Sequence, residues 1–227
     1  MLQRSFPEIK AIALLLFSVL LMGCVNRAES VFQTTQAADQ KNFSLLPSDG
    51  SSFYYYVGDD RLPLTPSLYW VAVKFASTDP AERSAALHES IVDTLKPVRE
   101  LPDPAWTILP LQENLTAEAL IEGINVLRAD RARVRQANPV FLAEGAEMIV
   151  TDEFIATFPA ETGKEDLQSI NSAQHVEIVE SIIGQANTYV LRVTQESRLD
   201  ALSMANLYRE SGWALESAPN FTRIIKK

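Results

Sequence analysis

The sequence predicts an α+β fold made of two similar halves that follow an N-terminal export segment. The first observation is that strand-like and helix-like segments occur twice in the same order. The second is a nearly constant spacing between corresponding positions, such as the 83 positions between Phe75 and Phe158. The third is a short apolar run close to Met1, which is typical of a signal peptide. Self-similarity at a fixed spacing indicates one structural unit used twice.

The first copy begins with a strand, because Val71, Val73 and Phe75 alternate toward one face. A helix is predicted next, since Leu87, Ile91 and Leu95 recur at i, i+4 and i+8 after a start signal at Asp79-Pro80. The remaining elements expected in this copy are a strand pair over 98–101 and 106–111, a helix begun near Thr116 and lined by Leu120, Ile124 and Leu127, and a strand ending at 138–141.

The second copy repeats this order. Phe154, Ala156 and Phe158 alternate as in a strand, and Leu167 and Ile170 mark a shorter helix after Thr162. The remaining elements expected here are a strand pair over 176–183 and 188–193, a helix lined by Ala201, Leu202, Ala205 and Tyr208 with a capping box at Ser197-Arg198-Leu199-Asp200, and a strand ending in Pro219-Asn220-Phe221.

Both copies read β-α-β-β-α-β, which is the split-βαβ or ferredoxin-like arrangement. We therefore expect two tandem ferredoxin-like repeats, each an antiparallel sheet with two helices on one face. An aromatic segment at 53–57, followed by a Gly58-Asp59-Asp60 turn, should add an edge strand to the first sheet or cap it. The expected boundaries are a signal peptide at 1–23, a lipid-anchored flexible linker at 24–52, a first repeat with this hairpin at 53–146, and a second repeat with a C-terminal tail at 147–227.

The N-terminus has the features of a bacterial lipoprotein signal. Arg4 and Lys10 precede an apolar run at 11–21, which is too short to span a bilayer comfortably. The run ends in Leu21-Met22-Gly23-Cys24, which resembles a lipobox, so Cys24 is the predicted lipidation site. An ordinary signal peptide with an incidental cysteine is the alternative. The expected location is the cell envelope outside the cytoplasm, and Val25 favours the outer membrane in a diderm bacterium.

Composition narrows the possible partners. Removing residues 1–23 takes away Arg4, Lys10 and Glu8, which changes the net charge from −9 to −10. This balance argues against a nucleic-acid partner, which requires a basic face.

Because Cys24 is the only cysteine, no internal disulfide is possible, and stability must come from a packed core. Residues 25–52 are polar and without a clear period, as in a flexible tether.

Catalytic signals are absent from the sequence. His88 lies at the border of a helical apolar stripe, and His175 lies in a predicted turn, so neither suits a catalytic base. No G-x-S-x-G, C-x-x-C, H-E-x-x-H or EF-hand pattern occurs. We therefore expect no enzymatic activity, no cofactor and no metal site.

Much of the chain after residue 52 resembles the N-terminal prodomain of subtilisin-like (S8 family) serine proteases, in the fervidolysin-like subgroup. The segments that carry this resemblance are at 53–67, 70–76, 137–141, 147–158, 175–182, 187–194 and 201–221. In that family, the prodomain sheet packs on the catalytic domain, and the tail after the last strand lies in the active-site cleft like a product. The resemblance implies a protein that inhibits a subtilisin-type protease or assists its folding.

The resemblance also implies a protease-binding tail and one departure from the family. Members of the family usually continue into a catalytic domain, whereas this chain stops where that domain would begin, so no catalytic residues are carried over. A frayed C-terminus is the alternative interpretation of the tail. The tail residues are Thr222, Arg223, Ile224, Ile225, Lys226 and Lys227.

These observations favour a stand-alone, lipid-anchored, prodomain-like protein that binds a subtilisin-type serine protease in trans. Two alternatives remain open at this stage. One is an N-terminal propeptide fragment of a split or truncated S8 endopeptidase. The other is an adaptor lipoprotein that binds an envelope protein other than a protease.

Overall fold

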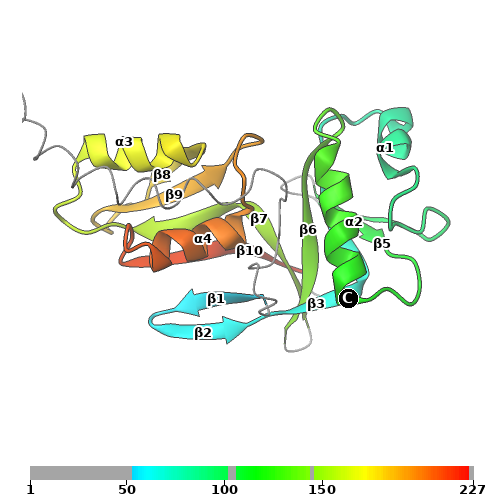
Figure 1. The fold of residues 1–227 in the computed structure, drawn as a ribbon, viewed down its shortest axis with the longest axis horizontal. Coiled ribbons are helices and arrows are strands. Elements are labelled where there is room, and N and C mark those ends of the chain that lie inside the picture. The colour runs from blue at the N-terminus through cyan, green and yellow to red at the C-terminus, as the bar shows by residue number, and fades with distance from the viewer. Residues whose placement is uncertain (1–52, 102–105, 144–145, 225–227) are drawn as a thin grey trace, which may run out of the picture. The chain divides into compact units, whose positions relative to one another are not determined.

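The computed structural model describes residues 53–101, 106–143 and 146–224, which all fall within one compact unit. The α+β class is confirmed, because these residues form four helices and ten strands whose pairings are antiparallel (Figure 1). The predicted signal peptide at 1–23, the linker at 24–52 and the lipidation site Cys24 lie outside the described residues. None of the described helices is long and apolar enough to cross a membrane.

The first half, residues 65–143, contains four strands and two helices. Its strand order is β4-β5-β3-β6, so the strand that comes first along the chain lies between the third and the fourth. The elements are β3 (Thr65–Phe75), α1 (Pro80–Leu87), β4 (Arg99–Glu100), β5 (Thr107–Pro110), α2 (Ala117–Ala129) and β6 (Val134–Ala143).

The second half, residues 146–224, repeats this order as β8-β9-β7-β10. Again the first strand along the chain lies between the third and the fourth, and the second strand lies at an edge. The elements are β7 (Ala146–Thr157), α3 (Lys164–Ala173), β8 (Val176–Ser181), β9 (Thr188–Val193), α4 (Ala201–Glu210) and β10 (Glu216–Ile224).

The two halves share one eight-stranded sheet. β6 and β7 form an antiparallel pair in which Val140 lies opposite Ile149 and Ala143 lies opposite Ala146. The sequence could not specify this pairing, because alternation defines the faces of a strand and not its neighbours.

Polar contacts also fasten the halves together. Lys74 of β3 forms a 2.7 Å ion pair with Asp152 of β7. The buried Asn138 of β6 donates from Nδ2 to the Val150 carbonyl oxygen at 2.6 Å. These groups come from both halves, so separating the halves would leave them without their partners.

Two helix boundaries differ from the sequence prediction. Asp79 caps α1 as expected, but the helix ends at Leu87, because Glu89 has a φ of 59° that an α-helix does not tolerate. Leu95 is therefore not part of a helical stripe and is 96% exposed. The predicted capping box at Ser197 is also wrong, since Asp200 caps α4 by accepting a hydrogen bond from the Ser203 backbone N–H. Ser197 instead donates to the His175 carbonyl oxygen.

Each face of the sheet carries a hydrophobic core. The larger core lies between the sheet and the helices, where Val73 of β3 and Phe154 of β7 belong to the same cluster as Leu120 and Tyr208 of the helices. The smaller core lies on the opposite face, and its members come from β3, β5 and the residue before it, β6, and the start of β7. Its fully buried members are Ala72, Trp106, Ile108, Val140 and Ile149.

The N-terminal hairpin does not add an edge strand to the first sheet, as one of the two expectations had it, and it packs mainly against the second half. Phe53 at its start does contact Phe141 of β6, with 5.2 Å between the ring centroids. β1 (Tyr54–Val57) and β2 (Asp60–Pro63) form a separate two-stranded sheet beside α4 and β10 (Figure 1). The hydroxyl groups of Tyr54 and Tyr56 donate to Glu210 Oε1 at 2.7 and 2.9 Å, and Arg61 forms an ion pair with the same oxygen at 3.0 Å. Asn206 Nδ2 also donates to the Tyr54 carbonyl oxygen at 2.9 Å, and Arg209 pairs with Asp59, so three residues of α4 hold the hairpin.

Ionisation of Tyr54 should weaken this contact at high pH. Burial and then the hydrogen bond to Glu210 raise the pKa of Tyr54 to about 12, whereas an unfolded tyrosine titrates near about 10. The contribution of protonated Tyr54 to the free energy of unfolding is therefore fully present below about pH 10 and is lost as pH rises through about 12. We expect the urea midpoint of Tyr54→Phe to fall less over this range than that of the wild type. Identical pH profiles for the two proteins would contradict this assignment.

Candidate functional site

The two histidines lie just after helices, in different halves of the sheet. His88 is the C-cap of α1 and is highly exposed next to Glu89. His175 lies in the turn between α3 and β8 with a φ of 53°, and its carbonyl oxygen accepts hydrogen bonds from Ser197 and Thr194. Within the described parts of the chain, no serine hydroxyl is hydrogen-bonded to a histidine ring, and no cluster of His, Cys, Asp and Glu could hold a metal ion.

Half of the predicted protease-binding tail belongs to a strand. Thr222, Arg223 and Ile224 lie in β10, opposite Ile149, Met148 and Glu147 of β7. Ile224 also packs against the smaller core. These three residues are therefore part of the sheet rather than an extension beyond it. The other predicted tail residues, Ile225, Lys226 and Lys227, lie outside the described residues.

A candidate docking surface lies on the face of the second half that is opposite to α3 and α4. Register places side chains of β7, β9 and β10 together on this face, because residues directly opposite each other share a side of the sheet. Ile155 lies opposite Val190 and Ala218, and Glu153 lies opposite Arg192. We call this surface the open face, and its residues are Glu153, Ile155, Thr157, Val190, Arg192 and Ala218.

The centre of the open face is apolar and only half-buried. Ile155, Val190 and Ala218 are of intermediate exposure and belong to neither hydrophobic core. Their neighbours along the strands, such as Phe154 and Leu191, point to the other side and are fully buried against the helices. None of the described helices covers the open face. On the corresponding face of the first half, Trp106 is fully buried in the smaller core.

One ion pair borders this apolar centre. Arg192 donates to Glu153 Oε1 at 2.5 Å, and Asn220 donates to the other oxygen of the same carboxylate at 3.4 Å. The hydrogen bond to Glu153 raises the pKa of the Arg192 guanidinium, and the nearby carboxylates of Asp152 and Glu177 act in the same direction. Glu153 and Arg192 thus form an ion pair beside the apolar centre of the open face.

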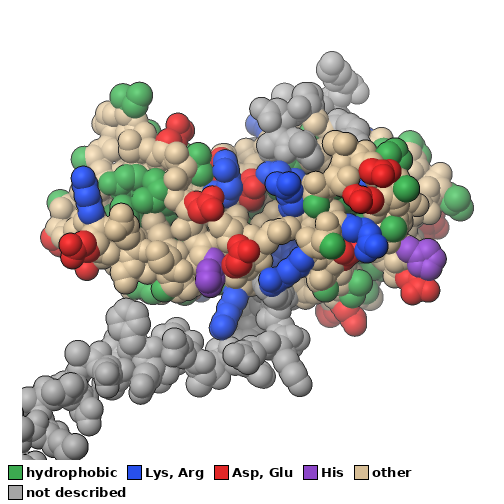
Figure 2. Space-filling model, turned by 90° about the horizontal axis from the view of Figure 1, so that it is seen from above, with side chains coloured by type: hydrophobic (Ala, Val, Ile, Leu, Met, Phe, Trp, Pro, Cys, Tyr) green, Lys and Arg blue, Asp and Glu red, His purple; other side chains and the backbone are tan. Residues whose placement is uncertain are grey.

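The edge strand β8 extends the apolar character of this half. Ile178 and Val179 are large hydrophobic residues that remain exposed, and Ile183 beyond the strand is almost fully exposed. Figure 2 shows hydrophobic side chains gathered over this half of the unit, with acidic and basic side chains among them. Exposed apolar groups bounded by polar groups are typical of protein interaction sites.

Part of the open face was readable in the sequence. The alternation that places Phe154, Ala156 and Phe158 on one side of a strand necessarily places Ile155 and Thr157 on the other. Their pairing with Val190 and Ala218 has no local signal, because these residues lie 35 and 63 positions away from Ile155.

Comparison with protein-family models finds no match for the chain, and a search of curated proteins also finds none.

Proposed function

We propose that this chain is a lipid-anchored, prodomain-like protein that binds a subtilisin-type serine protease and inhibits it or assists its folding. The observation that carries the proposal is the open face, a sheet surface with an apolar centre beside the Glu153–Arg192 ion pair that the described helices leave uncovered. In the proposed complex, the protease covers Ile155, Val190 and Ala218. The chain itself performs no reaction.

The proposal includes two tandem ferredoxin-like repeats. It is supported by the identical strand orders, β4-β5-β3-β6 and β8-β9-β7-β10, and by the position of one helix after the first and one after the third strand of each half. Only the second repeat would dock, because the smaller core around Trp106 occupies the corresponding face of the first. We therefore propose that one chain binds one protease molecule.

The proposed role of the tail is to enter the protease cleft in an extended conformation. Main-chain hydrogen bonds to an exposed edge of the protease would supply affinity, and side-chain pockets would supply selectivity. Thr222, Arg223 and Ile224 are extended and paired with β7, so residues 225–227 are the part of the tail that would enter the cleft. The lipid on Cys24 would hold the complex at the cell envelope.

Inhibition kinetics with a subtilisin-type protease test this proposal. The full chain should inhibit hydrolysis of a peptide substrate, and Ile155→Glu should raise the inhibition constant by about tenfold or more, because it places a charge in the centre of the interface. Tyr69→Glu is the matched control, since Tyr69 is 74% exposed in the first half and away from the open face. Removing residues 225–227 examines the tail separately, because β10 stays complete.

Two outcomes would count against the proposed function. One is the absence of both inhibition and binding at micromolar concentrations of the chain. The other is an equal loss of inhibition in Ile155→Glu and Tyr69→Glu, since this would assign the effect to general destabilisation or to a different surface.

A further inference from the structure

Three further glutamates border the open face. Glu177 of β8 lies opposite Arg192. Glu180 of the same strand lies opposite Val190, and Glu216 of β10 reaches this face from the other side of β7. All three glutamates are exposed, whereas Arg192 is already paired. A segment that covers the open face should therefore carry large apolar side chains, with positive rather than negative charge beside them.

One segment of this chain has that composition. Residues 40–46 read Gln-Lys-Asn-Phe-Ser-Leu-Leu and belong to the predicted linker, outside the described residues. Lys41 is the only charged residue among these seven, and Phe43, Leu45 and Leu46 supply three large apolar side chains. Phe43 and Leu45 are two positions apart, as two side chains on the same side of an extended chain must be. The segment therefore matches the open face in apolar character and in charge.

The described chain begins close enough to the open face for this segment to reach it. Phe53 is buried, and Tyr55 contacts Phe221 of β10 with 5.1 Å between the ring centroids. From Phe221 to Ala218 the path along β10 is about 10 Å long, at about 3.4 Å per residue. The six residues 47–52 precede Phe53 and span up to about 20 Å when extended. The intervening chain is therefore long enough.

The route passes the outer edge of β10. This strand pairs with β7 and with no other described strand, so its outer edge is free. The hairpin lies beside β10 without pairing to it. A chain that leaves Phe53 can therefore pass from the helix side of the sheet to the open face without displacing a strand. This step is about 10 Å, the thickness of one layer of packed side chains.

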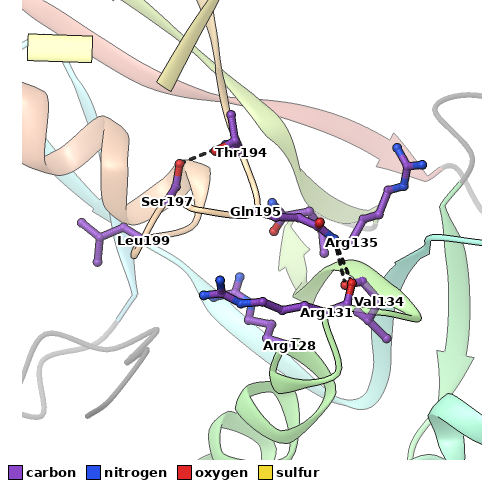
Figure 3. Close-up of a pocket in the computed structure, with 9 residues that line it drawn as sticks. Arg128, Arg131, Val134, Arg135, Thr194, Gln195, Ser197 and Leu199 are labelled. Carbon is purple, nitrogen blue, oxygen red and sulfur yellow. Dashed lines mark hydrogen bonds between the residues drawn. The ribbon is translucent and has the colours of Figure 1, made fainter. Parts of the chain in front are cut away.

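A recess elsewhere beside the second half does not fit this segment. It lies between α2, β6 and the loop that joins β9 to α4 (Figure 3). Its volume is about 30 Å³, the share of one water molecule in the liquid. Gln195 fastens the loop across it by donating to the carbonyl oxygens of Arg131 and Val134 at 3.3 and 3.5 Å. This recess is too small for a Phe or Leu side chain, whereas the open face can take several.

Covalent attachment favours this segment over a free peptide. A group joined to its site through a short linker acts at an effective concentration in the millimolar range. A weak apolar contact is then populated without a partner, and a partner has to compete with it.

We propose that residues 41–46 of this chain occupy the open face when no partner is bound. Phe43, Leu45 and Leu46 cover the apolar centre, and Lys41 lies among the bordering glutamates. The segment thereby regulates binding at this surface, and in that respect the inference rests on the proposed function. The contact itself involves one chain only and is measured without a protease.

Cysteine alkylation of the full chain tests this contact. Cys24→Ser removes the only native thiol, and Ala218→Cys places a thiol at a half-buried position of the open face. We expect Phe43→Asp/Leu45→Asp to raise the rate at which iodoacetamide modifies this thiol by about threefold or more, because the variant segment leaves the face.

Two controls define the expected specificity. Val31→Asp/Phe32→Asp makes the same kind of change elsewhere in the linker and should leave the alkylation rate unaltered. Ala76→Cys places the thiol at a half-buried position that follows β3 in the first half. Its alkylation rate should not respond to the change at Phe43 and Leu45, and a response would indicate general loosening of the fold.

Three results would overturn the proposal. One is an unchanged rate at Ala218→Cys in the Phe43→Asp/Leu45→Asp variant, since the face would then be open in both proteins. Another is an equal effect of Val31→Asp/Phe32→Asp. The third is protection that grows with protein concentration, which would assign the face to a second copy of the chain. If alkylation follows the expected pattern but no protease is inhibited, the contact stands and the proposed function fails.

Discussion

Arg128→Ala is expected to lower the free energy of unfolding by about 3–5 kcal/mol, because it leaves a buried carboxylate without its partner. The side chains of Arg128 and Asp200 are only 10% and 5% exposed. The same substitution removes the donors that satisfy Asn138 Oδ1 and the Ala137 carbonyl oxygen. Urea unfolding followed by circular dichroism measures the change.

A second variant separates charge burial from lost packing. In Arg128→Met/Asp200→Asn, both charges are removed, and asparagine retains the ability to cap α4. We expect this protein to be more stable than Arg128→Ala, since replacing a buried pair costs less than breaking one. Arg133→Ala is the control, because its partner Asp130 is more exposed and such pairs contribute about 0–1 kcal/mol. A loss in Arg133→Ala as large as in Arg128→Ala would contradict the interpretation.

Tyr208→Ala should destabilise the second half by a similar amount, about 3–5 kcal/mol. Tyr208 is fully buried, and its ring lies 5.0 Å from that of Phe154 and 5.4 Å from that of Trp213. Its hydroxyl donates to Asn171 Oδ1 at 2.8 Å. Removing the ring leaves a cavity between α4 and β7 and an unpaired amide of α3. The urea unfolding midpoint reports this loss.

Tyr208→Phe isolates the hydroxyl from the ring. It keeps the aromatic contacts but leaves Asn171 Oδ1 buried without a donor, which should cost about 1–3 kcal/mol. Tyr69→Ala serves as the surface control and should change stability by no more than about 0.5 kcal/mol. Equal effects of Tyr208→Phe and Tyr208→Ala would show that the ring contacts contribute nothing.

Local signals in the sequence located several elements correctly. Thr116 and Asp79 cap α2 and α1 as predicted, because a capping side chain bonds to backbone N–H groups within its own turn. The end of α1 was misjudged, since Leu87, Ile91 and Leu95 fit a helical period although the chain turns at Glu89. A repeated spacing of apolar residues therefore does not locate the end of a helix.

The sequence alone determined the α+β class and the order of strands and helices, because period and capping are properties of neighbouring residues. Only the tertiary structure decided that β6 pairs with β7, that the hairpin binds Glu210, and that Ile155 lies on an uncovered face. Alternation along a strand defines two faces, but the packing of distant segments decides which face is buried.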